Sequence, residues 1–550
     1  MAPTHEVLNQ STPFVDRNLY AIDAALREAV ALHGGAAADP ELGALGARLG
    51  SAEVQEWGRL ANVNPPVLRT YDRSGNRIDE VEFHPAWHEM MAMMIAAGVH
   101  ASPWADPGPG AQVARAAKYL LFSQVENGAQ CPVTMTFAVV PVIQKASRLA
   151  PHWLPRLLSR EYDRASRPAA EKRGVTMGMG MTEKQGGSDL RVNTTFAEPA
   201  GASDWGDEYR ITGHKWFFSA PQCDAHLVLA QTDRDSPAGL SCFFVPRWRR
   251  DGTRNAIRVE RLKDKLGNKS NASSEVEFIG ATGYLLGEIG RGVPTILEMG
   301  NHTRLDCVIG SAGQMRAALT HALHHARERS AFGRVLATQP LMKNVLADMA
   351  LESEAATRLA LRLARAYDGR FTSTPENLIA RVLTPASKYW VCKRGPMFGA
   401  EAMEVLGGNG YVEESPLARF YRELPVNSIW EGSGNIMCLD VLRAFGRTPD
   451  VRDALLDELA AARGANAHYD RFVDDLAADL RRAAIEEGQA RRLTERIALA
   501  MQGALLVRGG PAFVADAFCA SRLAGNGWGR AFGTLPAGAD LDALVARALP

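Results

Sequence analysis

The chain has no excess of charge of either sign. Its 550 residues contain 62 Lys and Arg against 62 Asp and Glu, so the formal net charge is zero. Proteins that hold nucleic acid through an overall positive field are basic, and that class is excluded for the chain as a whole. Hydrophobic residues make up 46% and charged residues 23% of the sequence. These ordinary values exclude collagen-like and disordered chains.

Cysteine is sparse, and signals for export or membrane insertion are missing. The first 16 residues have no basic region followed by an apolar run, and the longest uncharged run, 127–144, which ends before Lys145, is too short for a bilayer. No C-x-x-C occurs among the seven scattered cysteines Cys131, Cys223, Cys242, Cys307, Cys392, Cys438 and Cys519. This pattern predicts reduced thiols, and we expect a soluble, cytoplasmic protein with no membrane partner.

Two common kinds of site also lack their motifs. No G-x-G-x-x-G follows a strand, because Gly178-Met-Gly180 has the wrong spacing, which argues against a nicotinamide-binding Rossmann domain. His321, His324 and His325 share one helical face, but no acid or cysteine completes a metal site. We therefore expect no metal, and a structural or surface role for these histidines.

Hydrophobic periodicity predicts an α+β chain of four domains. Apolar stripes at helical spacing, such as Val113, Ala116, Leu120 and Leu121, occur before and after a region of short β-branched and aromatic runs at 209–213, 215–219, 226–230 and 241–245. The strands do not alternate with helices, so an antiparallel sheet is expected. The predicted order is an N-terminal helical domain, 1–174, a β domain, 175–286, a helical bundle, 287–445, and an extra helical domain, 446–550.

Two clusters with chemical potential lie in the β region. In Met179-Gly-Met-Thr-Glu-Lys-Gln-Gly-Gly-Ser188-Asp189, glycines let backbone N–H groups approach a ligand, and Thr182 and Ser188 add hydroxyl donors. Taken alone, such a stretch is more often a plain turn. In Lys215-Trp216-Phe217-Phe218-Ser219, the aromatics are either core residues of a strand or one wall of a site for a planar ring.

Two more clusters lie in the helical region that follows. Glu404-Val-Leu-Gly-Gly-Asn-Gly-Tyr411 has the glycines of a helix C-cap. In the segment 426–436, Glu431 stands among apolar residues just before a glycine-rich helix start. A carboxylate in such a setting suits a general base, although taken alone it is more often an acid at the start of a helix.

Together and in this order, the four clusters resemble those of the acyl-CoA dehydrogenase flavoprotein family. The resemblance runs from about residue 60 to 445 and implies a helical–β–helical fold that binds FAD. Residues 182–189 match the family's T-E-x-x-x-G-S-D element, which implies that Thr182 contacts the isoalloxazine and Ser188 the pyrophosphate. Residues 215–219 match its K-x-W-I-T strand, which implies Phe217 against the flavin and Ser219 near N5. Further implied FAD contacts are Met179, Gly180, Met181, Gly187, Phe218, Ile429, Trp430, Gly432, Ser433 and Asn435.

The resemblance also implies a multi-subunit enzyme. Arg329, Phe332 and Gln339 match the R-x-x-F-G…Q element that reaches the FAD of a neighbouring subunit, where a guanidinium suits a pyrophosphate. A homotetramer built as a dimer of dimers is therefore expected; a plain surface charge is the alternative for Arg329. Glu404, Gly407 and Gly408 fall on the adenine-side element, where many relatives have Gln in place of Glu404.

Glu431 matches the family's catalytic base in the Y-E-G-T motif. That base takes the α proton of an acyl thioester while FAD N5 accepts the β hydride. Trp430 and Ser433 replace the common Tyr and Thr, and Arg304 falls near the substrate-side arginine of the family. These departures keep the chemistry possible and leave an acyl thioester or another small substrate open.

The full length and segments such as 62–66, 261–268 and 427–443 are similar to one branch of the family that carries an extra C-terminal helical domain. The branch implies a role in the response to DNA alkylation, double-stranded DNA binding through that domain, and at most weak dehydrogenase activity. The alternative is a metabolic acyl-CoA dehydrogenase whose C-terminal extension serves tetramer packing.

The charges of the last segment give DNA binding mixed support. Residues 446–550 contain 13 arginines, no lysine and 14 acidic residues, a net charge of −1, whereas a DNA-binding segment is normally basic. Some arginines are nevertheless grouped at helical spacing, and a solvated, salt-bridged surface is the alternative for them. The expected DNA contacts are Arg443, Arg491, Arg492, Arg496 and Arg522.

Overall fold

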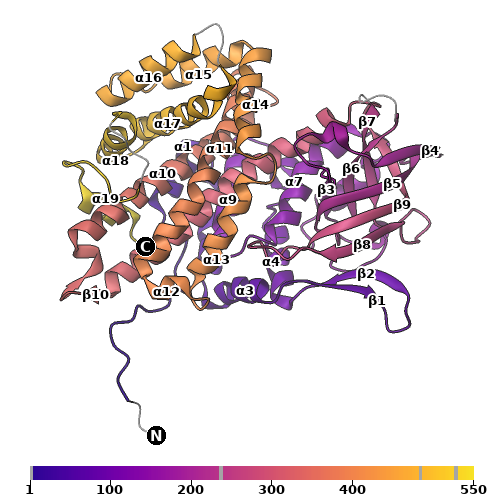
Figure 1. Ribbon diagram of the computed structural model, residues 1–550, viewed down its shortest axis with the longest axis horizontal. Helices are drawn as coiled ribbons and strands as arrows, with labels where there is room; N and C mark the ends of the chain where they lie inside the picture. Colours follow the sequence, from indigo (N-terminus) through magenta and orange to yellow (C-terminus); the bar gives the residue numbers. More distant parts are fainter. Residues whose placement is uncertain (1–3, 234–238, 482–485, 526–530) are drawn as a thin grey trace. The chain divides into compact units, whose positions relative to one another are not determined.

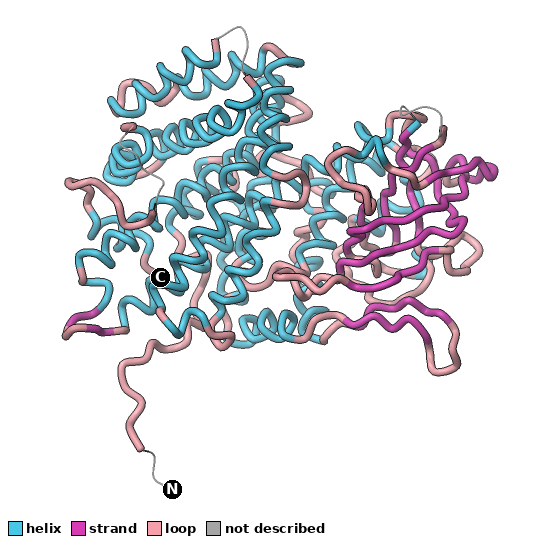
Figure 2. Tube along the Cα trace, in the orientation of Figure 1, coloured by secondary structure: helices cyan, strands magenta, loops and turns pink. Residues whose placement is uncertain are grey.

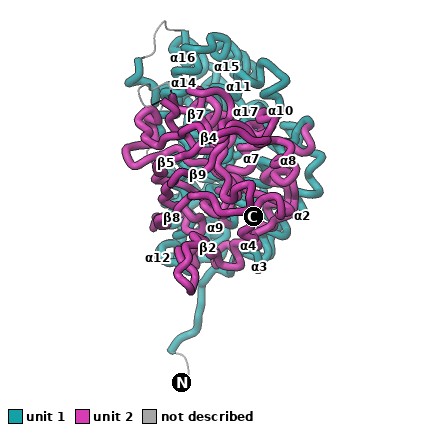
Figure 3. Tube along the Cα trace, turned by 90° about the vertical axis from the view of Figure 1, so that its right-hand side faces the viewer, with its two compact units in different colours: residues 1–55, 108–125, 304–550 teal, residues 56–107, 126–303 magenta. Residues whose placement is uncertain are grey.

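The computed structural model describes residues 4–233, 239–481, 486–525 and 531–550. It contains helices before and after a mainly antiparallel sheet, so the predicted α+β class is confirmed (Figures 1 and 2). By contacts the chain divides into two compact units (Figure 3). We call residues 56–107 and 126–303 the β unit, and residues 1–55, 108–125 and 304–550 the helical unit. These units do not follow the four expected boundaries.

The β unit is built on one large sheet. Within its described residues, seven strands form that sheet in the order β3-β6-β4-β5-β9-β7, with β8 paired to β9. All pairings are antiparallel except β3 and β4 with β6. The strands are β3 (Met177–Gly180), β4 (Phe196–Ser203), β5 (Gly206–Ser219), β6 (Ala225–Gln231), β7 (Leu240–Pro246), β8 (Ile257–Leu262) and β9 (Ser273–Leu286). The runs expected at 209–213 and 215–219 are one strand, β5.

Helices of the β unit are α4 (Pro85–Ala96), α5 (Ser102–Ala105), α7 (Gln130–Lys145) and α8 (Ala150–Leu157). A hairpin of β1 (Val67–Tyr71) and β2 (Arg77–Glu82) also lies here, in a region that periodicity predicted to be mainly helical. Its strands are short and half-exposed on both faces, so they carry little apolar alternation. The turn residues Ser74-Gly75-Asn76 were the available signal.

Helices make up most of the helical unit. They are α1 (Ala24–Leu32), α2 (Asp39–Leu49), α6 (Ala111–Ser123), α10 (Pro340–Gly369), α11 (Thr374–Leu406), α12 (Gly408–Tyr411), α13 (Pro416–Glu423) and α14 (Gly434–Arg447). The division between the units falls within α3 (Ala52–Val63) and α9 (Gly292–Glu328). Between α9 and α10, β10 (Ser330–Ala331) and β11 (Arg334–Val335) form a small hairpin.

The last hundred residues belong to the core of the helical unit. They form α15 (Asp450–Ala460), α16 (Ala467–Leu480), α17 (Ala490–Gly509), α18 (Ala512–Phe518) and α19 (Leu541–Ala548). The apolar stripe of α17 is buried, and this helix packs on α10, α11 and α14. Residues 446–550 therefore do not form a separate compact unit. No helix in the described ranges is both long and apolar enough to span a bilayer.

Candidate active site

A buried ion pair fixes the glycine-rich loop after β3. The Lys215 ammonium, on β5, lies 2.7 Å from the Glu183 carboxylate, and both side chains are 0% exposed. Glu183 also accepts hydrogen bonds from Gln185 Nε2, Thr194 N, Thr194 Oγ1 and Thr195 N at 2.7–3.1 Å. Burial alone would raise the pKa of Glu183, but Lys215 and these donors outweigh it and lower the pKa to about 2. The Glu183 carboxylate is therefore ionised at neutral pH, and its hydrogen bonds hold the loop in place.

Glycine is required in this region by close packing. A side chain at Gly187 would come within 2.5 Å of Thr182 Oγ1, and Gly186 has a φ of 151°. Thr182 is half-buried and Ser188 is exposed, so the loop presents one sheltered and one open hydroxyl. A side chain at Gly180 would instead meet the Phe218 ring at 2.6 Å, which gives that glycine a packing role inside the sheet.

The two phenylalanines of β5 point to opposite faces of the sheet. Phe217 is 53% exposed, whereas Phe218 is 1% exposed and stacks on His226 with ring centroids 4.0 Å apart. The backbone N–H of Trp216 donates to Thr182 O at 2.9 Å, which ties this strand to the loop. Because the side chain of Phe218 points to the opposite, buried face, Phe217 and Ser219 are the residues of this strand placed to meet a ligand on the exposed face. An exposed aromatic ring beside a loop of hydroxyl donors fits a flat heteroaromatic group that carries phosphates.

In the helical unit, Glu431 has a strained backbone held by buried cations. Its φ of 59° lies in the left-handed region, which costs a non-glycine residue about 1–3 kcal/mol. Lys388 Nζ, on α11, donates to the carbonyls of Trp430 at 2.7 Å and Gly432 at 2.5 Å. Arg304 Nε, on α9, donates to the carbonyl of Glu431 itself at 3.0 Å. Hydrogen bonds from charged donors contribute about 1.5–3 kcal/mol each, enough to offset the strain.

Lys388 and Arg304 together form a clamp on the Glu431 backbone, and Arg304 is itself held by a carboxylate. Arg304 lies 3.3 Å from Asp440, which also accepts from Arg381 at 2.9 Å. Arg304 was predicted to face substrate; the structure shows it orienting the Glu431 backbone, and substrate contact stays a prediction. Lys388 was missed, because a lysine in the middle of a long helix carries no sequence signal that it meets a loop 42 residues later.

Side chains around Glu431 extend the network. Trp430 Nε1 donates to Asn427 Oδ1 at 2.9 Å, and Asn427 Nδ2 donates to Ser311 Oγ at 3.1 Å. On the other side, Asn435 Oδ1 accepts from Arg491 Nε, on α17, at 2.8 Å. Ser433 is half-buried as the N-cap residue of α14, and Ile429 is 65% exposed. The Glu431 loop is therefore fixed from α9, α11 and α17.

The hairpin between α9 and α10 exposes a phenylalanine. Phe332 is 99% exposed and stands at its tip with a φ of 53°, followed by Gly333 at 74°. Two successive positive φ values fit a tight two-residue hairpin turn. Arg329 donates to Asn9 O, and Gln339 Nε2 donates to Ala331 O at 2.9 Å. Glu404, Gly407 and Gly408, at the end of α11, are also exposed. Arg329, Phe332 and Gln339 remain predicted contacts with a neighbouring subunit's FAD, and Glu404, Gly407 and Gly408 remain predicted contacts on the adenine side of FAD.

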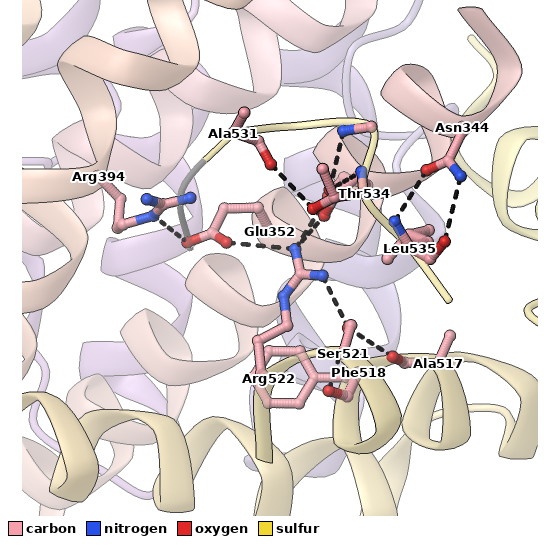
Figure 4. Close-up of polar contacts among 12 residues, drawn as sticks. Asn344, Glu352, Arg394, Ala517, Phe518, Ser521, Arg522, Ala531, Thr534 and Leu535 are labelled. Atoms are coloured by element: carbon pink, nitrogen blue, oxygen red, sulfur yellow. Dashed lines mark hydrogen bonds and ion pairs between the residues drawn. The ribbon is translucent and has the colours of Figure 1, made fainter. Parts of the chain in front are cut away.

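Arg522 does not belong to a DNA-binding surface. Its side chain is 0% exposed and pairs with Asp348 on α10. It also lies 3.5 Å from Glu352 on the same helix (Figure 4). The expectation that it contacts DNA is wrong, because a buried, neutralised guanidinium cannot reach phosphate. Arg496 is largely buried as well and pairs with Asp479. Arg443, Arg491 and Arg492 are exposed, and Arg491 is engaged by Asn435.

The histidine face of α9 packs against the N-terminal segment. His324 Nε2 lies 2.8 Å from Thr12 O, and His325 Nδ1 lies 2.9 Å from Ser11 Oγ. The Phe14 ring contacts His321 and His324 edge-on, with centroids 5.7 and 5.3 Å apart. Three or more residues grouped as metal ligands do not occur in the described ranges.

Comparison with known proteins assigns the chain to a family. Residues 9–164 match the adaptive response protein AidB N-terminal domain, 178–280 the acyl-CoA dehydrogenase middle domain, and 290–446 the acyl-CoA dehydrogenase C-terminal domain. The putative acyl-CoA dehydrogenase AidB of Escherichia coli K12 is 52% identical over 518 residues, 94% of each chain. Acyl-CoA dehydrogenase family member 11 of Caenorhabditis elegans is 32% identical over 72% of this chain and 65% of its own.

Solved structures agree with that assignment. The structure of Caenorhabditis elegans ACDH-11 in complex with C11-CoA matches with a TM-score of 0.85 and 27% identity, covering 95% of this chain and 94% of that one. Bd2924 in its apo form matches with a TM-score of 0.82 and 30% identity, covering 90% and 98%. Members of this family are FAD-dependent flavoproteins, and the loop and strand described above fit that cofactor. The chain therefore belongs to the acyl-CoA dehydrogenase family, and within it to the relatives of AidB.

Proposed function

We propose that this protein is an FAD-dependent oxidoreductase that removes two hydrogens from an acyl thioester, with Glu431 as the base. The observation that carries the proposal is the strained, clamped backbone of Glu431, because strain maintained by three charged hydrogen bonds is typical of functional sites. FAD, when bound, supplies the hydride acceptor. The proposed substrate class is supported by the ACDH-11 complex, whose ligand is C11-CoA.

The proposed roles of the chain's own residues follow the family match. Glu431, as a carboxylate, takes the α proton of the thioester. Thr182 and Ser188 donate hydroxyl hydrogen bonds, Phe217 covers the flavin ring, and Ser219 lies at its edge. Lys388 and Arg304 keep the base in one orientation.

Glu431→Gln tests this function, with Glu414→Gln, an exposed acid in the turn before α13, as the matched control. We expect Glu431→Gln to keep its flavin absorbance and to lower the rate of flavin reduction by acyl thioesters of different chain length about 10²–10⁴-fold, the range that a general base contributes. The control should behave as wild type. Equal reduction rates in wild type and Glu431→Gln would refute the assignment of the base.

The assembly is proposed to be a homotetramer built as a dimer of dimers. The proposal is supported by Phe332, which is 99% exposed at the tip of the hairpin and belongs to the element that, in the family, reaches a neighbouring subunit. We propose the cytoplasm as its location, since all seven cysteines are free and buried.

A role in the response to DNA alkylation, with double-stranded DNA binding and weak dehydrogenase activity, is the second part of the proposal. It is supported by the match to the adaptive response protein AidB and by the exposed guanidinium groups of Arg443 and Arg492. High turnover that Glu431→Gln abolishes would favour instead a metabolic enzyme whose C-terminal helices serve packing.

Duplex binding measured against salt concentration tests the DNA proposal. The variant Arg443→Gln/Arg492→Gln should bind more weakly, and the slope of log affinity against log salt should become shallower by about one for each phosphate that the variant no longer neutralises. Arg249→Gln, an exposed arginine of the β unit, is the control. Absence of salt-sensitive binding in wild type, or an unchanged slope in the double variant, would rule out these two arginines as DNA-binding residues.

A further inference from the structure

The β unit contains a cavity on the face of its sheet opposite to Phe217. The cavity has a volume of about 320 Å³, within the size range of sites for small molecules. Its wall comes from the β1–β2 hairpin, from β8 and β9, and from the segment 247–256 that follows β7. Phe218, the residue of β5 whose side chain points away from the exposed face, forms part of the lining together with His226.

Positive charge dominates the lining. Four arginines, Arg77, Arg247, Arg254 and Arg258, face one acid, Asp79. Asp79 is already neutralised by Arg77 at 2.9 Å. His226 adds no charge near neutral pH, because burial lowers its pKa to about 3. The residues that line the cavity therefore carry an excess of positive charge.

The arginines differ in whether the protein supplies a counter-charge. Arg77 pairs with Asp79 and Glu260, and Arg254 pairs with Glu80. Among the described residues, neither Arg247 nor Arg258 has a carboxylate within ion-pair distance. Arg247 has one hydrogen bond from its guanidinium, to Gln222 O at 3.3 Å. Burial and the nearby Arg254 lower the pKa of Arg247 by more than the surrounding carboxylates of Glu80 and Asp224 raise it.

The backbone holds Arg247 in this costly position. Its N–H donates to Asp224 O at 2.8 Å, and its carbonyl accepts from Asn255 N at 3.0 Å. Asn255 is in turn fixed by bonds from its Nδ2 to Pro246 O and Thr282 O. A guanidinium group that the fold holds in a partly buried position without an ion-pair partner lowers the stability of the protein unless an anion binds to it.

We propose that this cavity binds a small organic phosphate, separately from the FAD and acyl substrate of the proposed reaction. The phosphate oxygens would accept from the guanidinium groups of Arg247 and Arg258, which suit such geometry because each presents a planar fork of donors. The apolar part of the ligand would contact Pro221, Ile257 and Ile279, which also line the cavity. The inference does not depend on the chemistry at Glu431.

Binding of phenyl phosphate to the FAD-loaded protein, followed by calorimetry, tests the proposal without any turnover assay. Phenyl phosphate should bind saturably and at least threefold more tightly than inorganic phosphate, with the flavin absorbance unchanged. Arg247→Gln should weaken binding about tenfold or more, since it removes a charge-assisted hydrogen bond. Arg249→Gln, an exposed arginine outside the cavity, should bind as wild type.

Arg258→Gln covers the case in which Arg247→Gln fails to fold, because Arg258 is exposed on β8 and its loss should leave the melting temperature unchanged. We expect it to weaken phenyl phosphate binding about threefold to tenfold. Binding that never saturates, equal affinity for phenyl and inorganic phosphate, or affinity that neither cavity variant lowers would overturn the proposal.

Discussion

At the scale of single residues, two buried lysines hold loops in place, and only one of the two stands in a sequence motif that points to such a role. Lys215 stands in a recognisable motif, and Lys388 stands in none. Both are 1% exposed, and each satisfies oxygen acceptors that belong to a loop with a proposed chemical role. The loops at Glu183 and Glu431 thus depend on cations from neighbouring elements.

Lys388→Met should lower kcat about 10–100-fold while KM and flavin content change little. Without the ammonium, the carbonyls of Trp430 and Gly432 lose their donor, and Glu431 can leave its left-handed conformation. Steady-state kinetics with an acyl thioester measures the split between kcat and KM. Lys393→Met, an exposed lysine on the same helix, should leave both constants as in wild type; a Lys388→Met protein with unchanged kcat would argue against the clamp.

Glu183→Gln should lower the free energy of unfolding by about 3–5 kcal/mol, because Lys215 would remain buried without a counter-charge. The pKa of Glu183 is lowered to about 2, so its contribution is fully present above its unfolded pKa of about 4.5. That contribution is lost as the pH falls toward 2. Urea unfolding of wild type and variant at several pH values measures both effects, with the exposed Glu198→Gln as control; equal midpoints at pH 7 would contradict the prediction.

At the scale of elements, the C-terminal helices are tied to α10 by buried ion pairs. Arg522 reaches Asp348 and Glu352, while Glu352 also accepts from Arg394 at 3.1 Å (Figure 4). Asp348 further accepts from the backbone of Gly533 at 3.0 Å. Breaking such a network is costly because it leaves charge buried and unpaired.

Arg522→Gln should therefore destabilise the protein by about 3–5 kcal/mol, mainly through the uncompensated Asp348 carboxylate. Arg492→Gln, an exposed arginine on α17, should change stability by no more than about 0.5 kcal/mol. Thermal unfolding of the two variants makes the comparison directly. Similar melting temperatures for both would mean that the buried pair contributes nothing.

At the scale of the whole molecule, the zero net charge still excludes a protein that binds nucleic acid through an overall positive field. Residues 446–550 do not form a compact unit of their own. The buried stripe of α17 packs on α10 and α11, so removal of 446–550 would expose apolar surface of the helical unit. Charge-changing variants at Arg443 and Arg492 are therefore the appropriate probe of DNA binding. Of the five arginines expected at DNA, Arg522 is buried and Arg496 is neutralised by Asp479.

The sequence by itself determined the α+β class, the order of its main helical and β regions, and the family. Glycine-rich loops, strands rich in aromatics and a Glu before a helix start are local patterns, and their order along the chain is visible without coordinates. Only the tertiary structure decided that β5 turns Phe217 outward and Phe218 inward, that Lys388 clamps Glu431, and that Arg522 is buried. Pairings between residues 42 or 174 positions apart depend on how helices pack, and hydrophobic periodicity does not encode which partner a buried charge will meet.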